Sequence, residues 1–464
     1  MTELSWLTLL PPFLAIGLAL LTRQVYLALF AGIWLGFYLL NQSGVVASLA
    51  EALDGVLAVL ASPGDARVVM FTLVIGAFIV TLERSGAVSG FVRFLERSRW
   101  VTNGKRAQWM AWLIGIVIFI ESNITVLVAG TVSRPLFDRF RIAREKLAYI
   151  IDSTSAPICM LIPLNAWGAF NLGLLDGLGV EEPLTVLLAT IPLNLYAISA
   201  VALTAYTIAR NYNPGPMARV QARAAGDSVH DIELAASMGE KSHIKPRALN
   251  MFLPVAVLIL AMPAGLWITG NGEIFQGSGS TSVLWASLAA LTVISVLVLL
   301  QRSMTLDELS HTWMEGAGRM LPLAIILVLA LALGTVSKTL GTGQYVASLV
   351  GDSIPLALLP AVIFLVSGVI AFSVGSSWGT FSIMLPIAIP VATAMGAEPT
   401  LLVAAVLSGG IFGDHASPIS DTTIVSSLAS GTEHIEHVRT QLPYALRAGA
   451  VSIIGFVVLG YVML

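Results

Sequence analysis

Long apolar segments dominate this sequence and are the feature that most constrains its fold. Predominantly apolar stretches of about 18 or more residues recur along the whole chain, and each can cross a lipid bilayer as an α-helix. Charged residues make up 11% of the chain and hydrophobic residues 56%, whereas a soluble domain carries about 25% charged residues. A transmembrane β-barrel would show short alternating segments instead. The sequence therefore predicts an all-α polytopic membrane protein.

Ten segments are predicted to span the membrane. They are residues 5–21, 24–41, 68–83, 145–168, 183–209, 248–269, 282–300, 319–337, 400–427 and 441–463. Two further apolar segments, 107–133 and 355–396, are interrupted by ESN (Glu121 to Asn123) and by GSSWG (Gly375 to Gly379). We interpret both as re-entrant helical hairpins with tips at these interruptions. A full crossing at 107–133 would place one of its two arginine-rich flanking loops outside.

The lysine and arginine residues predict the orientation, because cytoplasmic loops carry an excess of both. With ten spans, two hairpins and both termini outside, all of the 24 Lys and Arg residues except Arg67 and Lys338 face the cytoplasm. The polar linker 211–246 is then cytoplasmic. We expect a solvated connector there, with a regulatory element as the alternative. The predicted location is the inner (plasma) membrane.

The two halves of the chain, 1–210 and 247–464, resemble each other in layout. Each is predicted to contain five spans and one hairpin, with a proline-broken helix after the hairpin. Weak sequence matches pair Gly86 with Gly341, Thr125 with Thr380, and Pro157 with Pro418. Five spans is an odd number, so the second half is inverted relative to the first. Inverted repeats with discontinuous helices are typical of secondary transporters, whose sites lie near the membrane midplane.

Ionisable residues are few in the predicted membrane segments, and they gather at the interruptions. They are Glu121, Asp152, Asp414, His415 and Asp421. Each costs roughly 2.5–3.5 kcal/mol on the insertion scale, so each is a candidate functional residue. A proline frees carbonyls one turn earlier, and unwound backbone is tolerated at this depth only where it lines a cavity. Carbonyl, hydroxyl and carboxylate oxygens suit a small hard cation such as Na⁺.

Hydroxyl and amide residues at the same places complete the candidate set. They are Ser155, Ser417, Thr422 and Thr423 at the helix breaks, Asn165 after the first break, and Ser122, Asn123, Ser376 and Ser377 at the hairpin tips. Structural alternatives exist: Asp421 can cap a helix N-terminus, His415 can hydrogen-bond a carbonyl, and hydroxyls can satisfy freed backbone. A carboxylate that binds Na⁺ or H⁺, but not both, would exchange the two ions. This favours an antiporter.

Other function classes lack sequence support. The chain has no phosphate-binding loop, zinc-protease motif or nucleophile elbow, so no enzyme is predicted. The net charge of −3 gives no sign of nucleic-acid binding. The single cysteine, Cys159, excludes an internal disulfide framework and a cysteine-rich metal site. No cofactor is predicted beyond Na⁺ as a transported ion.

Two motifs resemble those of a known protein family. GDHASPISDTTIVSS (413–427) resembles the signature of the NhaC-type Na⁺/H⁺ antiporters, which usually carry Cys where this chain has Ala416. SSWGTFSIMLPIAIP (376–390) resembles a second recurrent stretch of that family. The resemblance implies the ion transporter superfamily fold and a homodimer with a scaffold domain and a moving domain that carries both hairpins. It also implies a Na⁺ site at Asp414, Ser417, Asp421 and Thr422.

The transported solute has two candidate classes. The family implied by the resemblance also contains malate/lactate exchangers, so the alternative is Na⁺- or H⁺-coupled transport of a small organic acid or amino acid. An organic anion needs a positive partner, and no Lys or Arg lies near the predicted midplane. The predicted function is therefore Na⁺/H⁺ antiport by alternating access.

Overall fold

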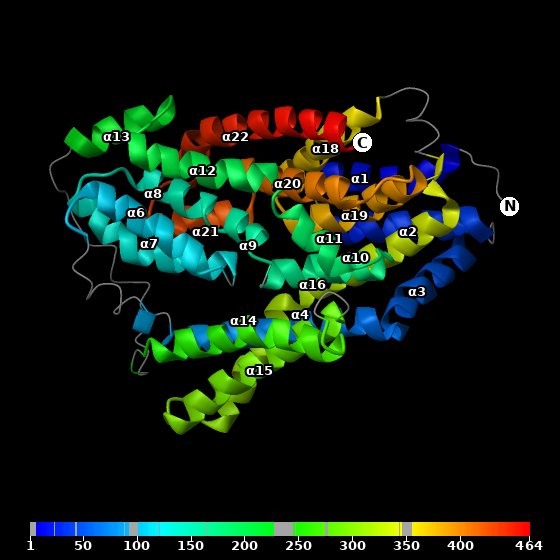
Figure 1. Ribbon diagram of the computed structural model, residues 1–464, viewed down its shortest axis with the longest axis horizontal. Helices are drawn as coiled ribbons and strands as arrows, with labels where there is room; N and C mark the ends of the chain where they lie inside the picture. Colours follow the sequence, from blue (N-terminus) through cyan, green and yellow to red (C-terminus); the bar gives the residue numbers. More distant parts are fainter. Residues whose placement is uncertain are drawn as a thin grey trace.

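Helices make up every regular element in the described part of the chain (Figure 1). The computed structural model describes residues 6–22, 24–41, 44–87, 89–91, 101–119, 121–163, 165–226, 245, 247–273, 277–342, 344–345 and 355–464. The elements of the first half are η1 (Trp6–Leu9), α1 (Leu10–Thr22), α2 (Val25–Asn41), α3 (Val45–Ala61), α4 (Pro63–Arg84), α6 (Gly104–Val117), α7 (Ser122–Arg139), α8 (Arg144–Ser153), α9 (Ala156–Leu161), α10 (Ala166–Gly177), α11 (Pro183–Thr190) and α12 (Leu195–Arg210). Those that follow are α13 (Pro216–Gly226), α14 (Leu249–Thr269), α15 (Gly279–Leu300), α16 (Leu306–Leu340), η3 (Leu356–Leu358), α18 (Leu359–Val374), α19 (Ser377–Ala394), α20 (Thr400–Ala416), α21 (Asp421–Ser430) and α22 (His434–Met463).

The helices confirm an all-α polytopic membrane protein. Within the described ranges, eight helices are long and apolar enough to cross a membrane, and up to eleven candidate spans result if each bent pair counts as one. Many large apolar side chains remain exposed, among them Leu260 on α14 and Val462 on α22. A bilayer would cover such faces, since lipid tails are as apolar as these side chains.

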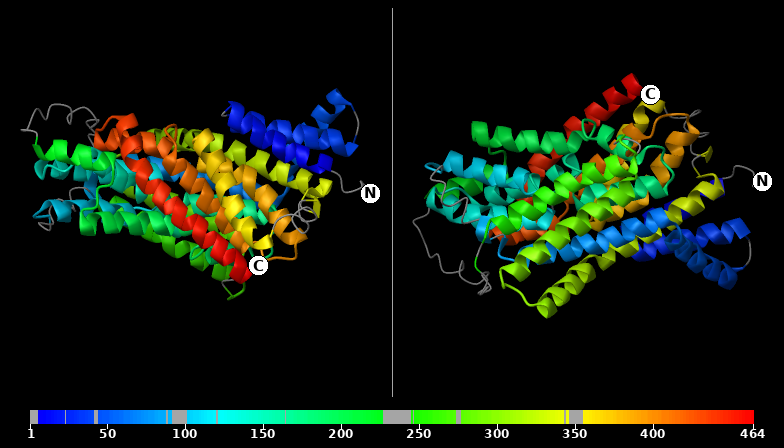
Figure 2. Two further views of the ribbon diagram at one scale, coloured as in Figure 1. Left: turned by 90° about the horizontal axis from the view of Figure 1, so that it is seen from above. Right: turned by 60° about the horizontal axis from the view of Figure 1, so that its bottom comes forward.

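Long helices from both halves pack together along one side of the molecule. Helix α4 packs against α15 and α16, α14 packs against α15, and α16 also contacts α2. Helices α4, α14, α15 and α16 lie along the lower part of Figure 1, and the views in Figure 2 show them side by side. Helices α12, α20 and α22 contact one another above this layer.

Both predicted hairpins appear as pairs of packed helices that are separated at the predicted tips. Helix α6 ends at Val117 and α7 begins at Ser122, and α18 ends at Val374 and α19 begins at Ser377. Gly375 has a left-handed backbone, with φ of 70°, which glycine adopts without strain. Each leg of the second pair is long and apolar enough to cross a membrane alone. Re-entry, rather than crossing, stays a prediction for both pairs.

Both predicted helix breaks are also present. Helix α20 ends before Ser417 and α21 begins at Asp421, with a bend of 45° between them. In the first half, α8 ends at Ser153 and α9 starts with Pro157 in its first turn. Proline cannot donate the backbone hydrogen bond that would continue the preceding helix, so the break follows from the sequence in each half.

Residues that the sequence pairs between the halves have matching local structures. Gly86 follows α4 with a φ of 73°, and Gly341 follows α16 with a φ of 75°. Thr125 donates its hydroxyl to the Glu121 carbonyl at 2.8 Å, and Thr380 donates to the Ser376 carbonyl at 3.0 Å. In both halves, a threonine in the first turn after the hairpin tip therefore binds back to that tip.

Several predicted segments differ from the structure. Helix α3 was not predicted, because Glu51 and Asp54 interrupt its apolar pattern; it is bent by 116° from α2. Helix α10 occupies part of the segment between the predicted spans 145–168 and 183–209. Its N-cap Asn165 accepts a hydrogen bond from Gly168 N–H at 3.0 Å. The predicted span 183–209 corresponds to one candidate span, Pro183–Arg210, although its helix is divided into α11 and α12 around Pro192.

The predicted linker 211–246 contains helix α13, and its role as a solvated connector stays a prediction. Residues 227–244 and 246 of this linker lie outside the described residues. Residues 92–100, which carry three of the arginines used to predict the orientation, also lie outside them.

Candidate functional site

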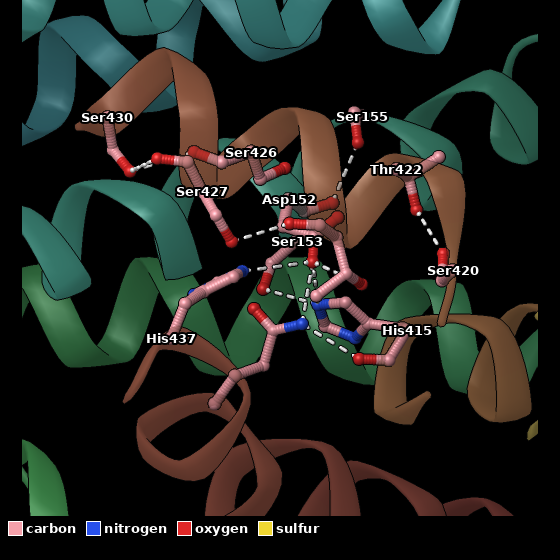
Figure 3. A network of polar contacts seen from close by, with 12 residues as sticks. Asp152, Ser153, Ser155, His415, Ser420, Thr422, Ser426, Ser427, Ser430 and His437 are labelled. Atoms are coloured by element: carbon pink, nitrogen blue, oxygen red, sulfur yellow. Dashed lines mark hydrogen bonds and ion pairs between the residues drawn. The ribbon is translucent and has the colours of Figure 1, made fainter. Parts of the chain in front are cut away.

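The helix breaks of the two halves meet in the interior of the structure. Helix α8, from the first half, packs against α21 and α22 from the second, and α9 contacts α20. Figure 3 shows the polar side chains that these helices direct toward one another. The site is therefore shared between segments that lie more than half the chain apart.

Asp152 is at the centre of this network (Figure 3) and is only 1% exposed. Its Oδ2 atom accepts hydrogen bonds from Gln441 Nε2 at 2.6 Å and from the Thr423 hydroxyl at 3.2 Å. His437 Nε2 lies 3.4 Å from the same oxygen. The hydroxyl of the predicted residue Ser155 donates to the Asp152 backbone carbonyl at 2.9 Å, so it contributes to the local turn. Neighbouring donors thus stabilise the carboxylate.

His415 connects both halves through its ring and its backbone. Its Nε2 lies 3.1 Å from the Ser153 hydroxyl and 4.0 Å from Asp152 Oδ2. Its Nδ1 lies 2.6 Å from the Tyr196 hydroxyl of α12. Its carbonyl accepts a hydrogen bond from Gln441 Nε2 at 2.7 Å. Gln441 therefore joins the freed backbone of one broken helix to the carboxylate of the other.

Asp414 occupies a different position, beside the tip of the second hairpin. It is 1% exposed, and its Oδ2 accepts a hydrogen bond from the Ser377 hydroxyl at 3.1 Å. Its Oδ1 is buried and has no hydrogen-bond partner within the described residues. Ser376 caps α19 by accepting a hydrogen bond from Gly379 N–H at 3.2 Å. The carboxylate thus faces a helix N-terminus, where the macrodipole favours negative charge.

The remaining predicted residues of the second break are close in sequence but differ in environment. Asp421 is exposed, although the sequence places it inside a membrane segment, and its Oδ1 accepts a hydrogen bond from Thr422 N–H at 2.9 Å. The Ser417 hydroxyl donates to the Phe372 carbonyl at 2.7 Å. The Thr422 and Ser420 hydroxyls are 3.0 Å apart.

The first hairpin tip forms a separate cluster. Glu121 Oε1 accepts hydrogen bonds from the Ser122 hydroxyl at 3.3 Å and from Asn123 Nδ2 at 3.1 Å. Asn165 Nδ2 lies 2.9 Å from the Phe119 carbonyl at this tip. It also lies 2.8 Å from the Cys159 carbonyl and 2.7 Å from the Ile162 carbonyl. Asn165 therefore connects the break that follows α9 to the first hairpin.

Comparison with known proteins identifies the family. A model of the Na⁺/H⁺ antiporter family matches residues 159–461, which include the second hairpin and the second broken helix. The chain belongs to the Na⁺/H⁺ antiporter family. This confirms the resemblance seen in the sequence, and it places the chain among secondary antiporters.

One relative of this antiporter covers almost its whole length, and another matches about a third of it. An uncharacterized protein of Haemophilus influenzae is 32% identical over 98% of this chain and 91% of its own. The malate-2H⁺/Na⁺-lactate antiporter of Bacillus subtilis is 28% identical over 36% of this chain and 36% of its own. The Alcanivorax borkumensis YdaH transporter has a similar fold, with a TM-score of 0.61, 13% identity and 89% of each chain covered.

Three residues of the antiporter's site were missed by the sequence analysis: Tyr196, His437 and Gln441. A usable signal exists for two of them. His437 and Gln441 are four residues apart on α22, which places them on one face of the helix. This face continues to His434, whose Nε2 lies 2.6 Å from the Pro418 carbonyl at the second break.

The described residues contain no cluster of three or more His, Cys, Asp or Glu side chains that could hold a metal ion. A Na⁺ site in this antiporter would depend on hydroxyl and carbonyl oxygens together with one or two carboxylates, as hard cations require.

Proposed function

We propose that this antiporter exchanges Na⁺ for H⁺ by alternating access, and that Asp414 is the carboxylate at which the two ions compete. One observation carries the proposal: Asp414 is buried, and its Oδ1 has no partner within the described residues. A charged oxygen without a partner is costly in a buried site. A bound proton or a bound Na⁺ would each remove that cost.

The surrounding groups support Na⁺ as the competing ion. The eight residues that follow Asp414 include Ser417, Asp421 and Thr422, which offer hydroxyl and carboxylate oxygens. The Ser417 hydroxyl donates to the Phe372 carbonyl and accepts from Ile419 N–H, which leaves one lone pair for a cation. The bend between α20 and α21 frees backbone carbonyls as further ligands. We propose Asp414, Ser417, Asp421 and Thr422 as the Na⁺ ligands.

Contacts between breaks and hairpins support coupled motion in each half. Ser417 at the second break binds the second hairpin through Phe372, and Asn165 binds the first hairpin through Phe119. We propose that the halves are inverted repeats and that each hairpin moves together with its broken helix. Such a unit could expose Asp414 to either side in turn. The homodimer, the external termini and the cytoplasmic linker stay predictions.

A liposome assay tests the proposed exchange. Addition of Na⁺ to acid-loaded vesicles that contain the wild-type protein should drive proton efflux, and Asp414→Asn should abolish it. Asp307→Asn removes a carboxylate from the exposed start of α16 and is the matched control, with near wild-type activity expected. Full exchange by Asp414→Asn would refute the assignment of this site.

A second candidate function is coupled exchange of a small organic acid. The match to the malate-2H⁺/Na⁺-lactate antiporter supports it, because that protein's name combines organic anions with both ions. It predicts Na⁺-dependent uptake of labelled lactate or malate, with little proton movement when Na⁺ is added alone. The same vesicles separate the candidates, and labelled amino acids extend the test to the remaining predicted class.

A further inference from the structure

Asp152 is a buried carboxylate whose positive partners are titratable. Within the described residues, its ion pairs are with two histidines, His437 at 3.4 Å and His415 at 4.0 Å. Thr423 and Gln441 supply only neutral donors. A buried charge needs an opposite charge nearby, and an imidazole supplies one only after it binds a proton. The charge balance at Asp152 therefore depends on proton binding.

The two histidines differ in how they are engaged. Both ring nitrogens of His415 have hydroxyl partners, Ser153 on one side and Tyr196 on the other. His437 is 0% exposed, and neither of its ring nitrogens forms a hydrogen bond with the residues that the structure describes. Its Nε2 still lies beside Asp152 Oδ2. His437 is thus the histidine with a free nitrogen directed at the carboxylate.

Further polar atoms around this pair are buried without partners in the described part of the chain. They are Asp152 Oδ1, Gln441 Oε1 and Ser426 Oγ. They come from α8, α22 and α21, so both halves contribute to the cluster (Figure 3). Buried polar atoms are normally hydrogen-bonded. A cluster with unused donors and acceptors can rearrange when a proton arrives or leaves.

The helices that pack around His437 carry further titratable and charged groups, several of which have partners of their own. Helix α8 carries Asp152, Tyr149, which stacks on Tyr444 of α22, and Lys146, which donates to Asn211. Arg144, at the start of α8, pairs with Asp138 of α7, and Arg223 of α13 pairs with Glu436 of α22.

The other helices around His437 also carry titratable groups. Helix α20 carries Asp414 and His415, α21 carries Asp421, and α12 carries Tyr196 and Arg210. On α22 itself, His434 binds Ser427 and the Pro418 carbonyl.

We propose that His437 and Asp152 form a second proton-binding pair, separate from the Na⁺ site at Asp414, so that each Na⁺ exchanges for two protons. The proposal rests on the proposed Na⁺/H⁺ exchange. In the proton-loaded state, the His437 imidazolium neutralises the Asp152 carboxylate, and a second proton is on Asp414. Entry of Na⁺ displaces the Asp414 proton without a change in net charge at that carboxylate. The shift of the second break that accompanies Na⁺ binding separates Asp152 from His437, and the buried imidazolium, without its counter-charge, releases the proton from Nε2. Two protons then leave as one Na⁺ enters.

Gln441 supplies a structural connection between the two sites. Its Nε2 atom donates to Asp152 Oδ2 and to the carbonyl of His415, the residue that follows Asp414. A shift of the second break on Na⁺ binding would therefore reach the carboxylate of the proton pair through one side chain.

The exchange ratio tests this proposal directly. Vesicles with a fixed Na⁺ gradient and a membrane voltage clamped at zero are prepared at a series of pH gradients, and the pH gradient that stops net Na⁺ flux is measured. A tenfold Na⁺ gradient is balanced by about half a pH unit if two protons exchange for one Na⁺, and by about one pH unit if one proton does. We expect the first result for wild type and the second for His437→Gln.

Two further variants separate titration from a structural role. His437→Arg keeps a positive charge beside Asp152 but does not release a proton, so it should show the ratio of His437→Gln. A wild-type ratio in His437→Arg or His437→Gln would overturn the proposal. His311→Gln, which changes an exposed histidine on α16, should keep the wild-type ratio. Variants that give no flux are compared by the Na⁺-induced shift of their thermal unfolding midpoint. His437→Gln should keep this shift, and its loss there would also overturn the proposal.

The assay distinguishes failure of the proposed function from failure of this inference. Wild-type vesicles that move no protons on addition of Na⁺ would overturn both. Wild-type exchange at one proton per Na⁺ would overturn the second proton site alone, and would leave Asp414 as the site of competition.

Discussion

Replacement of Gln441 by leucine should destabilise the protein strongly, although the side chains are similar in size. Gln441 Nε2 donates at 2.6 Å to Asp152 Oδ2 and at 2.7 Å to the His415 carbonyl. Leucine would leave both acceptors without this donor in a buried site. An unsatisfied neutral acceptor costs about 1–3 kcal/mol and a charged one costs more. Since Asp152 would keep the Thr423 hydroxyl, we expect a total loss of about 3–5 kcal/mol in the free energy of unfolding.

Reversible denaturant titration in detergent measures this loss. The matched control is Ser452→Ala on the same helix, because the buried Ser452 hydroxyl donates only within the helix, to the Ala448 carbonyl at 2.7 Å. That change should cost less than about 1 kcal/mol. Equal stability of Gln441→Leu and Ser452→Ala would refute the reasoning.

A double-mutant cycle tests whether the cost arises from the charge on Asp152. In an Asp152→Asn background, Gln441→Leu should cost about 1–2 kcal/mol less than in the wild type, because no buried charge loses its donor. Additive costs would show that Gln441 acts independently of the carboxylate.

Three further predictions follow from other parts of the structure. Gly413→Ala should destabilise the protein by about 1–3 kcal/mol, because an added Cβ would lie 2.1 Å from the Gly368 carbonyl oxygen. The control Gly318→Ala meets no atom within 4 Å and should be neutral or stabilising. Thermal unfolding midpoints compare the two variants. Asn165→Ala removes the contact with the first hairpin tip and should increase amide hydrogen exchange near residues 118–121, and protection equal to the wild type would count against that connection. If residues 107–133 form a re-entrant hairpin, single cysteines in place of the exposed Lys105 and Arg139 should both react with an impermeant thiol reagent from the cytoplasmic side. Labelling of the two positions from opposite sides would exclude the hairpin.

Local sequence signals were sufficient to predict the interruptions of the helices. Pro157 and Pro418 mark breaks, and Gly375 marks a tip, because each changes the backbone whatever the surrounding fold is. The family was also predictable, since its motif at 413–427 is contiguous. Helix α3 was missed because its apolar residues alternate with Glu51 and Asp54.

The contacts within the site could not be predicted from local patterns. Gln441 meets Asp152 across 289 residues of sequence, and nothing near either residue specifies that pairing. Asp414 and Asp421 look equivalent in the sequence, yet one is buried and the other exposed. Ser420 and Thr422, the neighbours of Asp421, are buried, so the exposure of Asp421 depends on the direction in which its own side chain leaves the backbone, not on its side of the bend. Tertiary packing therefore decides which carboxylate needs a bound ion.

Equilibrium binding of Na⁺ at different pH values tests the central claim of competition at Asp414. If Na⁺ and H⁺ compete for the site, acidification should raise the apparent dissociation constant of Na⁺ by about tenfold or more per pH unit in the range where the site binds protons. Asp414→Asn should bind no Na⁺ at any of these pH values. A dissociation constant that stays the same across the pH range, or wild-type Na⁺ binding by Asp414→Asn, would contradict the claim.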